Sequence, residues 1–205
     1  MFDRFLLLPL ALGLSITDVR AQSLAGIKLG GNAATVLEKI TLEPIAREGQ
    51  GGIKIVKYRQ VNGNELSVTY NNRSNRILYI ENDWCLKPEG AITDVPSFEF
   101  GVTTLEEIRR INGSNGFSWS RTAMNKTADQ IIAFNAYDIK SKPNQIAVFV
   151  TSLSLSEAKN KLTDPSRVAQ FFKLRAIILA EEDYLDEIWG EEKTYDKKSK
   201  PISWY

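Results

Sequence analysis

Two stretches of the chain read alike: LGGNAATVLEKI at 29–40 and FGVTTLEEIRRI at 100–111. Each holds an apolar residue, a glycine, a residue able to cap a helix, and a short run with apolar residues at helical spacing. The two stretches begin at residues 29 and 100, which is an offset of 71 positions. This recurrence predicts two related structural units, each of which opens with a helix.

The first unit is predicted to be a helix followed by a three-stranded antiparallel meander. Asn32 is a suitable N-cap for the helix, because its side chain can accept a backbone hydrogen bond. Strands are expected at 53–61, 65–70 and 76–82, where the sequence is rich in β-branched and aromatic residues. The dipeptide at 62–63, Asn-Gly, favours a tight hairpin because both residues tolerate positive φ.

The second unit repeats this order. Thr103 or Thr104 caps the helix, and Glu106 or Glu107 completes a capping box in the corresponding register. The strands of this unit are expected at 116–121, 130–138 and 144–152.

The predicted fold class is α+β, with two tandem helix-plus-antiparallel-meander units and an additional C-terminal helix. The offset of 71 also aligns Leu66 with Tyr137 and Leu78 with Phe149, which favours duplication over coincidence. The expected divisions are a signal peptide at 1–21, the first unit at 22–90, the second unit at 91–153, and a C-terminal helical segment with its tail at 154–205.

The C-terminal segment has a different pattern. Pro165 follows Asp164, which is typical of a helix start, and apolar residues keep roughly helical spacing up to Gly190. The run LRAIILA at 174–180 fits a strand as well as a helix, so both remain open there.

The N-terminal run RFLLLPLALGLSI at 4–16 is shorter than the roughly 20 apolar residues of a membrane-spanning helix. Val19 and Ala21 stand at −3 and −1 of a cleavage site after Ala21, so the segment is predicted to be a signal peptide. An uncleaved anchor and a buried strand are the alternatives. After cleavage the sequence predicts no membrane span. A periplasmic or secreted location is expected, and the single cysteine favours a bacterial periplasm.

The composition argues against several classes of function. The chain has 205 residues, a net charge of +1, one cysteine and no histidine. A nearly neutral chain has no basic excess for nucleic acid, so no nucleic-acid partner is expected. The absence of histidine removes the commonest general base and metal ligand, and no cofactor or metal is predicted.

Two sets of residues are candidates for binding. The first would form an aromatic sheet face, on which Trp and Tyr could act as contact residues; the alternative is that they form the core. This set contains Tyr70, Tyr79, Trp84, Trp119 and Tyr137. The second would form an acidic docking face on a helix, and the alternative is a solvated surface. This set contains Glu182, Asp183, Asp186 and Glu187.

The tandem pattern after a signal peptide resembles the β-lactamase inhibitory protein-like superfamily and the outer-membrane assembly lipoproteins of the SmpA/OmlA type. In those units a phrase of the form G-M-[ST]-x-x-[EQ]-[VIL] opens the helix. Gly30 with Val36 keeps its spacing, and Gly101-Val102-Thr103 is similar at its start, with Ile108 one position late. The chain lacks the lipid-anchor cysteine and the disulfides of these relatives. The resemblance implies a non-catalytic protein that binds other proteins through the concave face of its sheets.

The function predicted from the sequence is an exported, non-catalytic protein-binding module of the bacterial cell envelope, either an assembly accessory or a hydrolase inhibitor. The alternative is a periplasmic carrier of a small apolar ligand held between sheet and helix. An enzyme that uses carboxylates alone comes third, and it would need two Asp or Glu side chains in one pocket with pKa values pushed apart.

Overall fold

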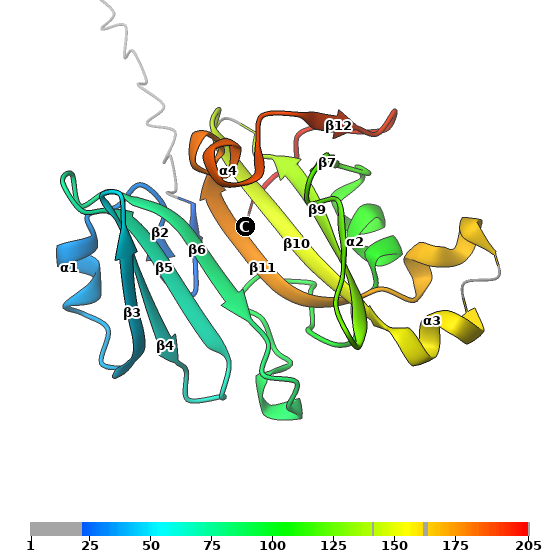
Figure 1. The fold of residues 1–205 in the computed structure, drawn as a ribbon, viewed down its shortest axis with the longest axis horizontal. Coiled ribbons are helices and arrows are strands. Elements are labelled where there is room, and N and C mark those ends of the chain that lie inside the picture. The colour runs from blue at the N-terminus through cyan, green and yellow to red at the C-terminus, as the bar shows by residue number, and fades with distance from the viewer. Residues whose placement is uncertain (1–21, 141, 162–163, 205) are drawn as a thin grey trace, which may run out of the picture.

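The computed structural model describes residues 22–140, 142–161 and 164–204 (Figure 1). The signal peptide predicted for 1–21 lies outside these residues. No helix in the described part of the chain is both long enough and apolar enough to cross a membrane.

Ten strands form one antiparallel sheet, in the order β12-β7-β9-β10-β11-β6-β5-β4-β3, with β8 paired to β9 (Figure 1). A separate hairpin pairs β1 (Ser23–Leu24) with β2 (Ile27–Lys28). The strands of the large sheet are β3 (Pro44–Gln50), β4 (Ile53–Arg59), β5 (Glu65–Asn71), β6 (Ile77–Asp83), β7 (Phe117–Trp119), β8 (Met124–Lys126), β9 (Gln130–Asp138), β10 (Gln145–Ser154), β11 (Lys173–Glu181) and β12 (Lys193–Tyr195).

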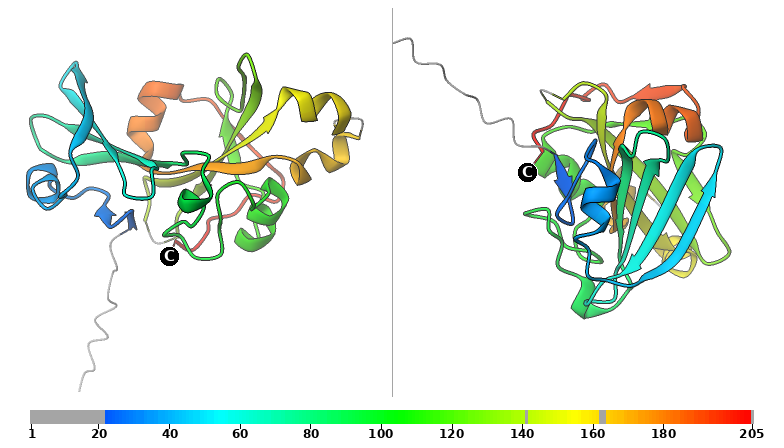
Figure 2. Two further views of the ribbon diagram at one scale, coloured as in Figure 1. Left: turned by 90° about the horizontal axis from the view of Figure 1, so that it is seen from below. Right: turned by 90° about the vertical axis from the view of Figure 1, so that its left-hand side faces the viewer.

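The helices are short and lie around this sheet. They are α1 (Ala33–Leu37), α2 (Leu105–Asn112), α3 (Leu155–Lys161) and α4 (Glu182–Trp189), with 3-10 turns η1 (Pro88–Gly90) and η2 (Pro165–Gln170). Figure 2 (left) shows α4 on one side of the sheet and α1 and α2 on the other. We call these sides the α4 face and the α1/α2 face.

The predicted α+β fold of two tandem helix-plus-meander units with a C-terminal helix is wrong. β11 lies in the middle of the sheet, paired with β6 on one side and β10 on the other. Both meanders are therefore parts of one antiparallel sheet. The residues 173–181 that join them are a strand, so the predicted C-terminal helical segment is divided into α3 and η2 before β11 and α4 after it.

The central position of β11 explains why its sequence has no clear period. Ile177 and Leu179 pack in the core of the α1/α2 face, whereas Ala176, Ile178 and Ala180 pack in the core of the α4 face. A strand that is covered on both faces reads as a continuous apolar run, which helical segments also produce.

Several local predictions are confirmed. The side chain of Asn32 caps α1, and Thr104 forms a capping box with Glu107 at the start of α2. The Asn62-Gly63 dipeptide lies in the hairpin between β4 and β5. The strand β3 was not predicted, because Pro44 and the glycines at 49–52 suggested a loop; β3 instead forms the edge of the sheet and pairs with β4.

Candidate functional site

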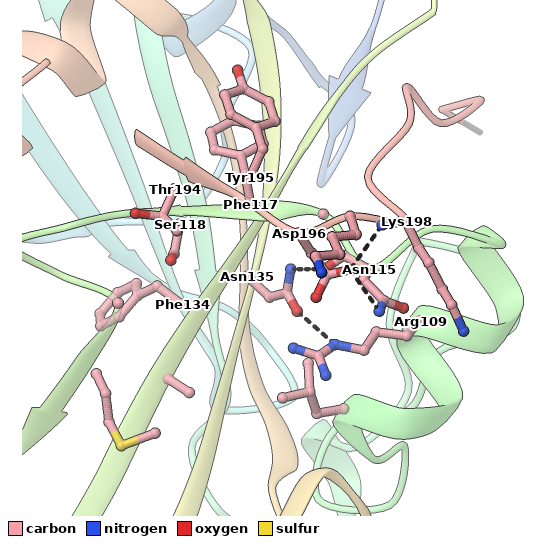
Figure 3. A pocket seen from close by; sticks show the side chains of 16 residues that line it. Arg109, Asn115, Phe117, Ser118, Phe134, Asn135, Thr194, Tyr195, Asp196 and Lys198 are labelled. Atoms are coloured by element: carbon pink, nitrogen blue, oxygen red, sulfur yellow. Dashed lines mark hydrogen bonds between the residues drawn. The ribbon is translucent and has the colours of Figure 1, made fainter. Parts of the chain in front are cut away.

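A groove of about 670 Å³ lies at one end of the sheet, where α2, β7, β9 and β12 come together (Figure 3). We call it the Arg109 groove. Segments far apart in the sequence form its lining, which consists of Leu105 and Arg109 of α2 and residues 115–118, 123–124, 133–135 and 194–198.

The groove opens where the outer edge of β9 changes its partner. β7 pairs with β9 at Ala136, and β8 pairs with β9 over 131–133. The connection 120–123 makes a turn between these two strands. Phe134 and Asn135 lie at this break and line the groove.

The guanidinium of Arg109 is held in the groove by one side of its fork. Its Nε donates to Oδ1 of Asn135 at 3.2 Å, and Nδ2 of Asn135 donates to the carbonyl of Asn115 at 2.9 Å. Asn135 is only 5% exposed, and the two bonds fix the orientation of its amide. Within the described residues the Nη atoms of Arg109 have no hydrogen bond or ion pair, and Figure 3 shows them directed into the groove. This planar fork is therefore available to a bidentate acceptor.

Hydrogen bonds tie the loop after α2 to the C-terminal segment. The buried hydroxyl of Ser114 donates to the carbonyl of Lys200 at 2.8 Å and accepts from the Lys200 amide at 2.9 Å. Nδ2 of Asn115 donates to Oδ1 of Asp196 at 3.0 Å. These hydrogen bonds hold the loop after α2 against the C-terminal segment, and so fix the positions of Asn115 and Asp196 in the groove.

Positive charge is in excess in the groove. Its lining contains the cations Arg109, Lys197 and Lys198 and the single carboxylate of Asp196. The hydrogen bond from the Lys198 backbone amide lowers the pKa of Asp196, so this carboxylate stays ionised at neutral pH. Both hydrogen bonds to Asp196 end on its Oδ1, and among the described residues it forms no ion pair with Arg109, although the charge of Arg109 also lowers the pKa of Asp196.

Aromatic side chains line the groove from the opposite face of the sheet, because Phe117 and Phe134 pack on the α4 face whereas Arg109 and Asn135 lie on the α1/α2 face. The ring of Tyr195 stacks on that of Phe117 with centroids 4.6 Å apart, and the ring of Phe134 also lines the groove. Met124 and Tyr195 at the rim are 57% and 51% exposed. The groove therefore offers a ligand a guanidinium from one face of the sheet and aromatic rings from the other.

The aromatic residues predicted as one sheet face are divided between the two faces. Trp119 and Tyr79 pack on the α4 face, whereas Tyr70, Trp84 and Tyr137 pack on the α1/α2 face. Trp119 and Tyr137 are almost fully buried. The structure therefore does not bring these five side chains together as a contact surface.

The four acidic residues predicted as a docking face all belong to α4, but they have different environments. Nζ of Lys193 lies 2.5 Å from Glu182 and 2.8 Å from Asp186, so these two carboxylates share one cation inside the molecule. Asp183 and Glu187 are exposed.

A group of ionisable side chains lies on the α4 face away from the helix. Glu65 is directly opposite Asp83, and Glu81 points to the same face. Burial raises the pKa of Glu81 and of Asp83, although Arg175 donates to Asp83 and the hydroxyl of Tyr79 donates to Glu81. Both shifts have the same direction and the same largest cause, which is desolvation by burial.

Among the residues that the structure describes, no cluster of three or more Asp, Glu or Cys side chains is arranged to hold a metal ion. The residues that build the Arg109 groove were not predicted from the sequence. Arg109 and Asn135 are 26 positions apart, and no motif connects them. The only local signal was the Lys-rich tail at 197–200, which supplies part of the positive charge.

No protein-family model matches the chain, and no curated protein matches it. Among solved structures, the chain is similar to an extracellular protein containing a SCP domain from Bacillus anthracis str. Ames, with a TM-score of 0.46 and 14% sequence identity. The match covers 84% of this chain and 50% of that protein, so the chain spans half the length of this neighbour. We base the function on the residues of the chain itself.

Proposed function

We propose that the chain is an exported, non-catalytic binding protein of the bacterial cell envelope. In this proposal the Arg109 groove receives a segment of another protein that carries a carboxylate next to an apolar side chain. The observation that carries the proposal is the half-engaged guanidinium of Arg109, which Asn135 holds at Nε while both Nη atoms stay available. A guanidinium fixed in this way matches the two oxygens of a carboxylate.

The rim of the groove supports a protein segment as the ligand. Small molecules are usually enclosed in pockets that bury most of their surface. Here Met124 and Tyr195 leave large apolar surfaces exposed at the rim. Tyr, Met and Arg are the residue types that are enriched in protein interfaces. The same groove would serve an assembly accessory or an inhibitor of a hydrolase.

Export and the lack of catalysis rest on separate observations. The apolar run at 4–16, followed by Val19 and Ala21, supports export. The absence of histidine, the commonest general base, supports a binding role over acid/base chemistry.

Isothermal titration of the purified chain with three peptides tests the proposal. The peptides are acetyl-Ala-Phe-Asp-Ala-amide, its neutral isostere acetyl-Ala-Phe-Asn-Ala-amide, and acetyl-Ala-Ala-Asp-Ala-amide. We expect the Phe-Asp peptide to bind at least 10-fold more tightly than either of the others. Arg109→Gln should remove the preference for Asp over Asn, whereas Arg110→Gln, with the same charge change on the exposed side of α2, should keep it.

Equal binding of the Asp and Asn peptides to the unaltered chain would contradict the proposal. So would equal losses in the Arg109→Gln and Arg110→Gln variants, because the effect would then be one of net charge. Thermal melting of both variants checks that the fold is kept.

The alternative function, a carrier of a small apolar ligand, would use a different site. An apolar-lined hollow of about 570 Å³ lies next to Ile27, Ile40, Leu42 and Leu66. A carrier would bind the neutral probe N-phenyl-1-naphthylamine saturably there, and Leu42→Ser would weaken this binding. The protein-binding proposal predicts no saturable fluorescence increase with this probe.

A further inference from the structure

A second groove, of about 530 Å³, lies on the α4 face between the β3–β4 hairpin and α4. We call it the β3–α4 groove. Ile53 and Ile55 of β4 and Tyr184 and Ile188 of α4 supply its apolar lining. Ile188 is 47% exposed, so part of this apolar surface faces solvent.

Both charged side chains that line the β3–α4 groove are acidic, Glu48 and Glu187. Glu48 has the Nζ of Lys57 at 3.7 Å in a solvent-exposed pair, which contributes little neutralisation. Glu187 is exposed, and the described residues form no ion pair with it. It lies in the last turn of α4, where the unpaired backbone carbonyls add further negative potential.

One cation that contacts the acidic residues of α4, Lys193, is bound away from Glu187. Nζ of Lys193 is bound between Glu182 and Asp186, and it lies over the ring of Trp119. It therefore does not neutralise Glu187. Tyr184 packs edge-to-face against Tyr79 with centroids 6.0 Å apart, which gives the groove a wall with a fixed position.

We propose that the β3–α4 groove is a second docking site, which takes an extended segment of a partner protein that carries Lys or Arg next to branched aliphatic residues. The aliphatic side chains would cover Ile53, Ile55 and Ile188, and the cation would pair with Glu187. Charge complementarity identifies this occupant, because both charged side chains of the lining are carboxylates. This site has the opposite charge preference to the Arg109 groove and does not depend on it.

Titration of the isotope-labelled chain, followed by NMR, tests this site with three probe peptides. They are acetyl-Lys-Ile-Lys-Ile-amide, acetyl-Glu-Ile-Glu-Ile-amide and acetyl-Lys-Ser-Lys-Ser-amide. We expect the Lys-Ile peptide to shift the methyl resonances of Ile53, Ile55 and Ile188 and to bind at least 10-fold more tightly than the other two. Glu187→Lys should weaken this binding at least 10-fold, and Ile188→Ser should weaken it several-fold.

The matched control is Glu38→Lys, which makes the same charge change at an exposed position at the end of α1. It should leave binding of the Lys-Ile peptide unchanged. Equal binding of the Glu-Ile peptide, or equal losses in the Glu187→Lys and Glu38→Lys variants, would overturn the proposal. A dimer of the unaltered chain that dissociates in Glu187→Lys would also overturn it, because the occupant would then be a second copy. Binding of the Phe-Asp peptide to the Arg109 groove should be the same in all these variants, so the two sites can fail separately.

Discussion

The indole Nε1 of Trp119 donates a 2.8 Å hydrogen bond to Oδ1 of Asp186, which connects β7 to α4. Nζ of Lys193, on β12, lies 2.8 Å from the same carboxylate oxygen and 5.1 Å from the centroid of the Trp119 ring. Glu182 completes the cluster, with its Oε1 at 2.5 Å from Lys193. Three elements at one end of the sheet are therefore joined by a single set of charged contacts.

Replacement of the central cation should loosen this cluster. Lys193→Met leaves two partly buried carboxylates without a cation, and we expect it to lower the free energy of unfolding by about 2 kcal/mol. Lys197→Met removes the same charge from an exposed position and should change it by less than about 0.5 kcal/mol. Urea titration of the two variants measures the difference. Equal effects would show that the cluster contributes nothing beyond net charge.

Gly116 allows the loop after α2 to approach β9. It has φ +69°, and a Cβ there would overlap the carbonyl oxygen of Ala136 and the side-chain amide of Asn135. Gly116→Ala should cost about 2 kcal/mol or more in the free energy of unfolding, and it should weaken Phe-Asp peptide binding by displacing Asn135. Gly51→Ala is the matched control, because Gly51 has φ +60° with open space around it, and its cost should be about 1 kcal/mol. Similar costs for the two variants would contradict the role of close approach.

The hydroxyl of Tyr137 is buried beside the side chain of Asn112, but the two groups do not form a hydrogen bond of normal geometry. Tyr137→Phe removes this unpaired group, so we expect the free energy of unfolding to stay the same or to rise by about 0.5–1 kcal/mol. Burial raises the pKa of Tyr137 to about 12. The folded state therefore holds this proton where the unfolded state releases it, and stability falls as the pH rises above about 10. The Phe variant should lose less stability than the unaltered chain in that range. A loss of more than about 1 kcal/mol at neutral pH would show that the hydroxyl has a partner.

Glu81 should oppose folding once it is ionised. Burial raises its pKa above the value in the unfolded chain, so the folded state binds the proton more tightly. Its effect is absent below the unfolded-state pKa and grows as the pH rises through the folded-state pKa. Glu81→Gln should therefore be more stable than the unaltered chain at pH 7, and this advantage should disappear at pH 3.5.

Urea titrations of Glu81→Gln and of the exposed control Glu191→Gln at pH 3.5, 5.5 and 7 measure this dependence. The control should show no such gain between pH 3.5 and pH 7. A Glu81→Gln variant that is less stable than the unaltered chain at pH 7 would mean that the hydrogen bond from Tyr79 to the ionised carboxylate outweighs the cost of its burial.

Local signals in the sequence predicted local structure, because they depend on neighbouring residues alone. Asn32 and Thr104 cap their helices through hydrogen bonds three residues along the chain. The hairpin around Asn62-Gly63 depends on the φ preference of its own residues. The position of β11 could not be predicted in this way. Its pairing with β6 joins residues more than 90 positions apart, and its sequence has no period because both of its faces are covered.

The candidate site also depends on contacts between residues that are far apart in the sequence, so it could not be predicted from local signals. Trp119 and Asp186 were assigned from the sequence to two separate contact surfaces, yet each is the partner of the other. The residue types, tryptophan and aspartate, indicated that both side chains could contact another protein. Only the fold shows that they contact each other within this chain. Arg109 carried no distinguishing signal, because an arginine in the last turn of a helix is common. Its role depends on Asn135, which the sheet brings next to it.

The central claim is that Arg109 binds the carboxylate of a ligand with the part of its guanidinium that Asn135 leaves free. An NMR titration of the chain labelled with ¹⁵N-arginine tests this claim directly. The guanidinium resonances are observed while acetyl-Ala-Phe-Asp-Ala-amide is added. We expect the Nη resonances of Arg109 to shift and to exchange more slowly with water, while those of Arg110 do not change. Unchanged Arg109 resonances at saturating peptide, or equal shifts at the two arginines, would contradict the claim.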